Sequence, residues 1–456
     1  MASITPLVFS PTVLLALWGK LRGGDRTRPT PNFGWKDSVV DIVVPAKNEE
    51  QLIALCLASI LDQDYAVRKI TVIDDGSTDR TAAVVRRFEQ LSGRTLELVV
   101  RRKSIGKTPS IREVCRQSDA DAIVVVDGDT VLSDRNYVSR VIEELFRNPG
   151  VASACGEVTP LGRRRGRALV AMDQHLRSLV SELDLDITKR RSVMRALLEG
   201  MTYIYRSALY LFLQRFLYDG HVKLFGSRLN PIGCAVAYRT ARLRDCFDYA
   251  QPRMGDNLSS SEDIFIGHFF AWKGWRNAQV NGVRCESLEP ALTRLPRQLY
   301  LWSSSFLQTQ YYFQDLPLSL FKQMKRLFRR DRVPAGGERR EVREQYRAPW
   351  GEAYTHRYGR PMGLLDSCSL LEKVCYPVVL LYLAIFSPEA ALLTIGAESL
   401  LATAGVFAVA RNGDRVRSAA MMLAATPIRV LSLGVDLISV LKYGLDLATG
   451  NRNWRK

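Results

Sequence analysis

The pattern of hydrophobic and polar positions divides the chain into an α/β part and a largely apolar C-terminal part. Between residues 39 and 129, short runs rich in valine and isoleucine alternate with segments of helical periodicity. The apolar runs lie at 39–46, 69–76, 95–102 and 121–129, and the amphipathic segments at 49–61, 81–91 and 110–118. Buried β-branched strands that alternate with helices are typical of a parallel sheet covered by helices. The pattern therefore predicts an α/β domain of the nucleotide-binding type.

The regular alternation ends after Asp129. Residues 163–225 have a mostly helical pattern with mixed apolar and basic faces, and a strand-like pattern returns at 233–239. Residues 299–330 combine aromatic and basic positions in amphipathic segments that suit a membrane interface. The following stretch, 331–362, is polar and loop-like.

Two stretches near the C-terminus are long and apolar enough to cross a bilayer, for which about 17 residues is the lower limit. They run from Leu370 to Phe386 and from Ala390 to Ala410. A third stretch, 419–447, contains Pro427 and Arg429. It is either a kinked span or a half-span followed by an interfacial helix.

The N-terminal residues 5–18 are apolar but barely long enough to span a membrane. A secretory signal is the alternative, but this stretch has no basic start and no small-residue cleavage site, and its positive charges follow it. We therefore expect an anchor whose N-terminus lies outside. The basic loop 411–417 favours a cytoplasmic position for itself and for the α/β domain.

These patterns predict four parts in chain order. They are an N-terminal transmembrane anchor (1–20), a cytoplasmic α/β domain (37–298), interfacial amphipathic helices with a loop (299–365), and C-terminal transmembrane or interfacial helices (366–456). The composition agrees with this segregation, because 47% of the residues are hydrophobic while the mean hydropathy is only -0.07.

Charge and cysteine usage exclude several classes of protein. The net charge is +17, and its basic clusters mostly flank apolar stretches, which favours an anionic membrane surface over nucleic acid as the partner. Eight cysteines form no C-x-x-C pair, and four histidines form no pair at ligand spacing. A zinc ribbon and a thioredoxin motif are therefore unsupported, and reduced cytoplasmic thiols are expected.

Two predicted strands end in pairs of acidic residues. Asp74 and Asp75 follow one strand, and Asp127 and Asp129 follow another. In an open parallel sheet, ligands bind at the carboxyl ends of the strands. Carboxylates at D-x-D spacing can hold a hard divalent cation whose other ligands are phosphate oxygens and water. Helix capping and turn formation are the structural alternatives for each aspartate.

Five motifs occur in the order that is seen in inverting family 2 glycosyltransferases. They are VVPAKNEE (43–50), VIDDGSTDRT (72–81), VVDGDT (125–130), SSEDIFIGHFFAWKGW (260–275) and RQLYLW (297–302). Within that family the chain resembles the membrane-integrated synthases of hyaluronan, chitin and cellulose. This resemblance implies a GT-A-type, Rossmann-like domain combined with transmembrane and interfacial helices, and a loop of the gating type within 299–365.

The resemblance also implies roles for individual residues. Asp74, Asp75 and Glu49 would contact the uridine; Asp127 and Asp129 would bind the sugar-diphosphate and Mg²⁺ or Mn²⁺; Lys107 would lie near the donor. Asp263 matches the catalytic base, and Glu262 beside it, together with partial desolvation, would raise its pKa toward neutrality. A helix N-cap is the structural alternative for Asp263. Gly233, Cys234, Gln298 and Trp302 would line the acceptor site, and Trp454 and Arg455 match the C-terminal tryptophan and arginine near the active site of the synthases, in a gating role.

One position departs from the family pattern. The synthases carry Q-x-x-R-W, whose arginine meets the donor diphosphate, but this chain has Leu301 at the arginine position. Leucine cannot donate a hydrogen bond to phosphate. Either Arg297 or Arg294 substitutes from a neighbouring turn, or the contact is lost and the donor or product differs.

Three functions remain open from the sequence. The first is a membrane-embedded transferase of the plasma or inner membrane that uses a UDP-sugar and a divalent metal to extend and export a β-linked polysaccharide. The second transfers a single sugar to a membrane lipid, in the manner of ceramide glucosyltransferases. The third is a non-enzymatic membrane scaffold whose acidic tips are structural. The expected partners are the UDP-sugar, a growing polysaccharide or lipid acceptor and membrane lipids, with no nucleic acid.

Overall fold

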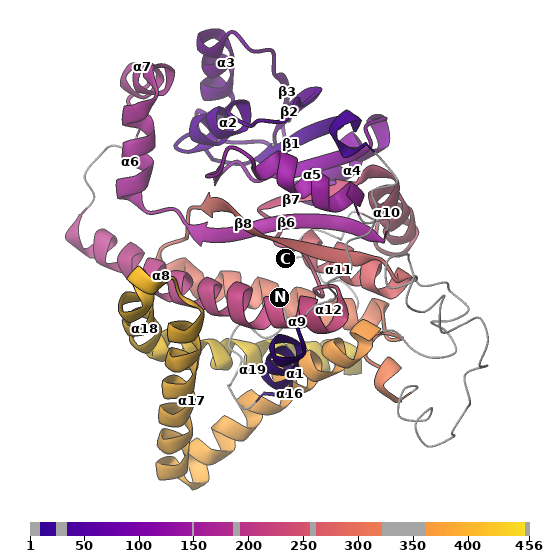
Figure 1. Cartoon of the computed structure of the whole chain (residues 1–456), viewed down its shortest axis with the longest axis vertical. Coiled ribbons are helices and arrows are strands. Elements are labelled where there is room, and N and C mark those ends of the chain that lie inside the picture. The colour runs from indigo at the N-terminus through magenta and orange to yellow at the C-terminus, as the bar shows by residue number, and fades with distance from the viewer. Residues whose placement is uncertain are drawn as a thin grey trace.

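A mixed eight-stranded sheet forms the centre of the protein (Figure 1). The computed structural model describes residues 10–23, 34–147, 150–185, 192–255, 261–321 and 361–451. The strands are β1 (Val40–Ala46), β2 (Lys69–Asp74), β3 (Glu97–Val100), β4 (Ala122–Val126), β5 (Thr130–Leu132), β6 (Val151–Pro160), β7 (Ala235–Arg239) and β8 (Arg276–Ser287). Their order across the sheet is β3-β2-β1-β4-β7-β6-β8-β5.

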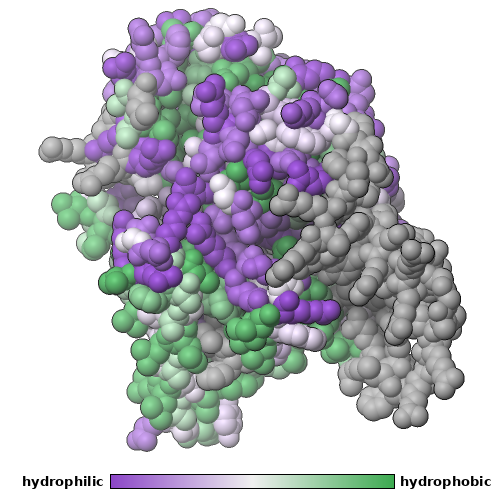
Figure 2. Space-filling view, viewed as in Figure 1, coloured by the Kyte–Doolittle hydropathy of each residue, from purple (hydrophilic) through white to green (hydrophobic). Residues whose placement is uncertain are grey.

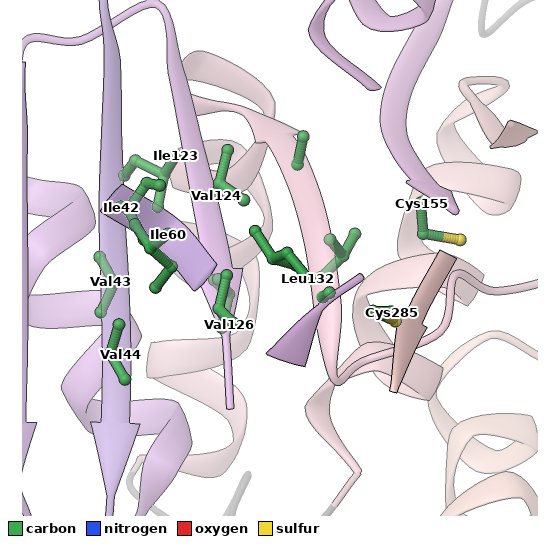
Figure 3. Packing of buried hydrophobic residues seen from close by; sticks show 14 of the residues in the cluster. Ile42, Val43, Val44, Ile60, Ile123, Val124, Val126, Leu132, Cys155 and Cys285 are labelled. Carbon is green, nitrogen blue, oxygen red and sulfur yellow. The ribbon is translucent and has the colours of Figure 1, made fainter. Parts of the chain in front are cut away.

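The first half of the sheet is parallel, as the sequence predicts. β1 pairs with β2 and β4, and β2 pairs with β3, all in parallel register. The central strands β1 and β4 are buried along their whole length, which explains their valine and isoleucine content. Figure 3 shows Ile42 and Val44 of β1 beside Val124 and Val126 of β4 in this core. The ends of these strands therefore have fixed positions.

The second half of the sheet lies outside the parallel pattern predicted at 39–129 and contains antiparallel pairs. β7 runs antiparallel to both β4 and β6, and β5 runs antiparallel to β8. β7 confirms the strand-like pattern at 233–239, whereas the sequence pattern did not reveal β6 and β8. These two strands pair in parallel with register shifts at two points. All eight cysteines are free, including the buried Cys155 and Cys285 that Figure 3 shows on these strands.

Helices cover the sheet and extend below it. Those of the α/β part are α2 (Ile53–Leu61), α3 (Thr81–Ser92), α4 (Lys107–Gln117), α5 (Tyr137–Arg147), α6 (Arg163–Met172), α7 (Gln174–Glu182), α10 (Thr240–Met254) and α11 (Glu262–Lys273). Beneath the sheet in Figure 1 lie α8 (Val193–Leu211), the π-helical segment η3 (Phe212–Tyr218), α9 (Asp219–Phe225) and α12 (Leu295–Tyr312). α8 packs against β6, and α12 packs against α11.

Two helices have the length and apolar composition to cross a membrane. They are α16 (Pro361–Phe386) and α17 (Pro388–Val409), which confirm the two predicted spans as helices and form the lower part of the molecule in Figures 1 and 2. Their outer surface is largely hydrophobic in Figure 2. The third apolar stretch forms α18 (Arg415–Ala424) and α19 (Thr426–Ala448), and the helical segments 412–424 and 426–448 meet at a bend of 48°. Among the described residues there are thus two candidate spans, or three if this bent pair is one span.

Ion pairs join these C-terminal helices where they are buried. Lys373 of α16 lies 2.7 Å from Asp436 of α19, and both side chains are almost completely buried. Arg429 of α19 pairs with Glu398 of α17 in the same manner. Since a buried charge is costly without its partner, each pair fixes one contact between α19 and a neighbouring helix.

The N-terminal helix α1 (Pro11–Arg22) packs against α9 at a crossing of two glycines. A Cβ atom on Gly19 would lie 2.0 Å from the carbonyl oxygen of Gly220, so the backbones touch. Lys20 Nζ also lies 2.7 Å from an Asp219 carboxylate oxygen. The helix is therefore tied to the segment beneath the sheet.

Candidate active site

A cavity of about 230 Å³ opens beside the carboxyl end of β4. It lies between the acidic tip of that strand, the start of β7, the start of α11 and one face of α12. Its lining includes the predicted residues Lys107, Asp127, Asp129, Gly233, Cys234, Glu262, Asp263, Gln298 and Trp302. Segments from five parts of the sequence therefore contribute to one site.

The acidic tip of β4 is held in place by backbone hydrogen bonds. The Asp127 amide donates to the carbonyl of Cys234 over 2.8 Å, and the Gly128 amide donates to the carbonyl of Pro45 over 3.2 Å. Gly128 is closely surrounded here, because a Cβ atom would lie 3.1 to 3.3 Å from three side chains, including that of Glu49. The two carboxylates of the tip therefore lie beside the carboxylate of Glu49.

Burial favours the protonated forms of these three carboxylates, and repulsion between them adds to the effect at Glu49 and Asp127. Burial, together with Asp129 and Asp127, raises the pKa of Glu49 to about 9. Burial also raises the pKa of Asp127 to about 7, although Lys107 opposes the shift. Asp129 shifts in the same direction because of burial. A cation at this tip would relieve the repulsion and favour the ionised forms.

Lys107 connects the acidic tip to the start of α11. Its Nζ lies 2.6 Å from Asp127 Oδ1 and 2.7 Å from Glu262 Oε1, and it donates a hydrogen bond of 3.1 Å to the carbonyl of Gly233. Burial would lower the pKa of this amine, but the two carboxylates raise it well above its ordinary value. The residue is therefore a fixed cation in the wall of the cavity.

Asp263 is held against a glycine at the cavity wall. A Cβ atom on Gly233 would lie 2.8 Å from Asp263 Cγ, so only glycine permits this approach. Burial and the adjacent Glu262 raise the pKa of Asp263, while Lys107 and the Ile264 amide lower it in part. The net shift is upward, which suits a carboxylate that accepts a proton near neutral pH.

The residue before α11 has a strained backbone, and hydrogen bonds hold the helix that follows it. Ser261 has a φ of 50°, a conformation that costs a residue with a side chain about 1 to 3 kcal/mol, and its hydroxyl makes no capping bond to the helix. Farther along α11, His268 Nδ1 lies 2.7 Å from the carbonyl of Ile264, and His268 Nε2 lies 3.3 Å from Asp366 of α16. Gln310 of α12 donates to the same Asp366 oxygen over 3.0 Å. The helix that carries Asp263 is thus joined to a candidate membrane span.

The acidic tip of β2 lies outside the cavity lining and is satisfied by its own loops. Asp74 accepts a bond of 2.9 Å from the Ser77 amide, which matches the turn-forming alternative. Asp75 accepts bonds from Ser104 Oγ and from the Ile105 and Gly106 amides at 2.6 to 3.0 Å. Burial alone would raise the pKa of Asp75, but these bonds lower it below its ordinary value. Asp75 thereby positions the loop that leads into Lys107.

A buried arginine lies behind the α12 wall of the cavity. Arg206 of α8 is fully buried and donates a bond of 2.6 Å to Gln298 Oε1. Its guanidinium carbon lies 4.4 Å from the ring centre of Trp302, and its Nε lies 3.2 Å from Glu289 Oε2. Tyr210 donates to the other Glu289 oxygen over 2.8 Å. All four partners of this network line the cavity.

One of the two alternatives for the missing motif arginine is substitution by Arg294 or Arg297 from a neighbouring turn. Arg294 and Arg297 are exposed and do not line the cavity. Arg206, which the sequence analysis did not single out, instead contacts both the glutamine and the tryptophan of the Q-x-x-R-W motif. Trp454 and Arg455 lie outside the described residues.

The residues at the acidic tip fit a divalent cation that is only partly held by protein. Among the residues that the structure describes, no group of three or more acidic, histidine or cysteine side chains is arranged to hold a metal ion. Asp127 and Asp129 supply two carboxylates on one cavity wall. Mg²⁺ is commonly bound by one or two carboxylates, with phosphate oxygens and water as its other ligands.

Comparison with known proteins relates the chain to other glycosyltransferases. An N-acetylglucosaminyltransferase of Rhizobium leguminosarum bv. viciae is 34% identical over 134 residues, which is 29% of each chain. One of Bradyrhizobium elkanii is 31% identical over 126 residues, which cover 27% of this chain and 68% of that protein. The matching segment spans only about 30% of the length of this Rhizobium leguminosarum protein and of two further N-acetylglucosaminyltransferases, from Sinorhizobium fredii and Rhizobium meliloti.

Solved structures with a similar arrangement share little sequence with this chain. A mannosyltransferase from Pyrobaculum calidifontis, in complex with GDP-Man and Mn²⁺, aligns over 92% of this chain and 94% of its own with 17% identity and a TM-score of 0.48. Glucosyl-3-phosphoglycerate synthase from Mycobacterium tuberculosis, with Mn²⁺ and UDP, aligns over 57% of this chain and 75% of its own with 19% identity and a TM-score of 0.31.

The sequence model of the family described as Glycosyl transferase family 2 matches residues 41–193, the segment that contains both acidic tips. Together with the sheet order, this match confirms the predicted GT-A-type α/β fold. The similarity to the Bradyrhizobium elkanii protein extends over more than two thirds of that relative. The chain therefore belongs to glycosyl transferase family 2.

Proposed function

We propose that the protein transfers a sugar from a UDP-sugar to a carbohydrate hydroxyl, with inversion, to extend a β-linked polysaccharide at a membrane. The observation that carries this proposal is the placement of Asp263 in the same cavity as Asp127, Asp129 and Lys107. That arrangement offers a base for the acceptor opposite charged groups for a diphosphate. The names of the curated relatives make N-acetylglucosamine the first sugar to test.

Asp263 would act as the base. As the acceptor oxygen attacks the anomeric carbon, its proton passes to the Asp263 carboxylate, the bond between that carbon and the diphosphate oxygen breaks, and UDP leaves with the electron pair. Displacement from the opposite face inverts the configuration. The raised pKa of Asp263 and its fixed contact with Gly233 support this role, because a base must be both suitably basic and correctly placed.

Asp127 and Asp129 would hold Mg²⁺ or Mn²⁺ against the donor diphosphate. When bound, such a cation stabilises the negative charge that develops on the leaving UDP. Lys107 places a second positive charge on the same side of the cavity, paired with Asp127 and Glu262. The carboxylates of Asp127 and Glu262 therefore both remain close to the Lys107 amine while the donor enters.

Arg206 would position the acceptor side of the cavity. Its guanidinium stacks on Trp302 and donates to Gln298, so it fixes the two residues that the family motif assigns to this region. Leu301 leaves the motif without an arginine, and α8 supplies one from the other side. We expect Arg206 to act through these neighbours, because it does not itself line the cavity.

The membrane placement follows from the C-terminal helices. α16 and α17 would cross the plasma or inner membrane, and the basic turn 411–417 would lie on the cytoplasmic side with the sheet. A single transfer to a membrane lipid is the second candidate function, since these helices would bring the sheet to a bilayer. The size and lipid solubility of the product distinguish the two functions.

Replacement of Asp263 by asparagine tests the proposal. Asparagine keeps the shape but cannot accept the proton, so we expect release of UDP from UDP-N-acetylglucosamine to fall by about 10² to 10⁴-fold. Donor affinity and melting temperature should stay close to wild type. Asp173 caps α7 by accepting a bond from the Leu176 amide, so Asp173→Asn is a matched control that should be nearly silent.

The proposal fails if Asp263→Asn retains activity within a few-fold of wild type under saturating donor and Mn²⁺. Wild-type protein, assayed with a panel of UDP-sugars, identifies the donor.

A further inference from the structure

A second cleft, of about 990 Å³, joins the cavity beneath the sheet. Four residues line both spaces: Val158, Tyr210, Leu288 and Glu289. The cleft runs along one face of α8, past β6 and β8, and reaches the turn between α17 and α18. A molecule that fills it would extend from the catalytic carboxylates to the end of a candidate membrane span.

The outer end of the cleft lies at the level expected for a membrane surface. α17 ends at Val409, and the next residues of the turn, among them Arg411, Asp414 and Arg417, line the cleft. Arg411 and Arg417 are exposed, and the structure gives no ion pair for either side chain among the described residues. Basic residues directly after a span are typical of the polar boundary of a bilayer.

The first half of α8 presents an apolar face beside this opening. Val193, Met194 and Leu197 are 87%, 64% and 58% exposed, and Met201 and Ile204 continue the same face. α8 packs against α18, so the face adjoins the membrane helices, and the free end of α8 carries a green hydrophobic patch on the left of Figure 2. The exposed apolar side chains and the contact with α18 make lipid the fitting neighbour of this face.

The inner part of the cleft carries polar and aromatic side chains among its apolar lining. Arg215 pairs with Glu157 at 3.0 Å, which leaves this part of the wall without a free charge. Gln214 donates to the Val158 carbonyl and accepts from the Val158 amide, and so ties the π-helical segment η3 to β6. Tyr203 contributes an aromatic side chain. Hydroxyl groups and aromatic faces suit a saccharide more than an acyl chain.

We propose that this cleft binds a saccharide carried on a lipid, with the sugar directed to the catalytic cavity and the lipid chain leaving past α8 into the bilayer. This inference rests on the proposed transferase function and assigns its acceptor. Arg411 and Arg417 would contact the linkage between saccharide and lipid. The acceptor would thus enter from the side, along the membrane surface.

Gly200 offers a way to obstruct the cleft without disturbing the fold. It lines the cleft from α8, and a Cβ atom at this position meets nothing within 4 Å. Gly200→Phe should therefore raise the KM for a lipid-linked acceptor at least tenfold. Gly396 of α17 is equally open but does not line the cleft, so Gly396→Phe is the matched control.

The assay uses the full chain in lipid nanodiscs, with the same oligosaccharide supplied free in water, on a neutral lipid and on a polyprenyl phosphate. Slow release of UDP to water, without acceptor, is measured in parallel and should change less than twofold in Gly200→Phe. Absence of any UDP release from the wild type would refute the transferase function itself. Normal UDP release with an unchanged acceptor KM in Gly200→Phe, or use of the free oligosaccharide as efficient as that of the lipid-linked one, would overturn the cleft assignment alone.

The double variant Arg411→Glu/Arg417→Glu tests the outer end of the cleft. A fall in affinity confined to the phosphate-linked acceptor identifies an anionic linkage, and an equal fall for both lipid-linked acceptors identifies a neutral one. No fall for either would overturn the proposed site. Arg86→Glu on α3, an exposed arginine outside the cleft, is the control for the change in charge.

Discussion

Replacement of Arg206 by lysine separates the positioning role of this residue from its role in folding. Lysine keeps the positive charge beside Glu289, which the structure places 3.2 Å from the arginine Nε. It loses the planar contact with Trp302 at 4.4 Å and the directed bond of 2.6 Å to Gln298. The change therefore loosens two cavity residues while the buried carboxylate stays paired.

The expected loss follows from these two contacts. A partly buried cation–π contact contributes about 0.5 to 2 kcal/mol, and a hydrogen bond from a charged group about 1.5 to 3 kcal/mol. Because the lysine amine recovers part of each, we expect a net loss of about 2 kcal/mol, or about 30-fold in kcat/KM. The loss should appear mainly in the KM for the acceptor, while UDP release in the absence of acceptor changes little.

Two further variants complete the test. Arg206→Leu leaves Glu289 buried without a countercharge, which costs about 3 to 5 kcal/mol, so this variant should melt at a clearly lower temperature. Arg195→Lys changes an exposed arginine on the same helix and should be silent. An Arg206→Lys enzyme with wild-type acceptor KM would refute the reasoning, because the network would then be structural only.

Four other predictions concern the cavity and its motif. Leu301→Arg restores the motif arginine, so donor affinity should rise or product length should change, and a variant that only misfolds would show that the motif alignment is wrong. Asp127→Asn and Asp129→Asn should each weaken Mn²⁺-dependent donor binding, and equal donor affinity at limiting Mn²⁺ would exclude the metal site. In the wild type, protons compete with the metal for Asp127, whose pKa is about 7, so Mn²⁺ affinity should rise with pH between about 5 and 7 and level off above; a flat titration would contradict this. Gly233→Ala places a Cβ atom 2.8 Å from Asp263 Cγ and should lower turnover without loss of donor affinity, which crystallography of the variant and steady-state kinetics can check.

The sequence predicted the parts of the site that depend on local pattern. A run of buried valines that ends in D-x-D places its carboxylates at a strand end whatever the rest of the chain does, and the structure places them in the cavity. The apolar helix that begins at Glu262 likewise predicts the position of Asp263 at its start.

The remaining features depend on contacts between distant segments. β8 buries Asn277, which bonds to Ser153 and to the backbone of 228–229, so its sequence lacks the apolar alternation of an ordinary strand. Arg206 occurs among tyrosines and leucines, where an arginine normally indicates an exposed helix face. Its burial depends on Glu289, and no local pattern relates these two positions.

The two ion pairs of the C-terminal helices constrain the order in which the protein can be assembled during synthesis. A charged side chain at the centre of a bilayer costs about 2.5 to 3.5 kcal/mol on translocon scales, and α19 carries both Arg429 and Asp436. Their partners, Glu398 and Lys373, belong to helices that leave the ribosome earlier. The last helix can thus dock onto charges that are already in place, and a nascent chain that stops before α19 keeps two buried charges without their partners.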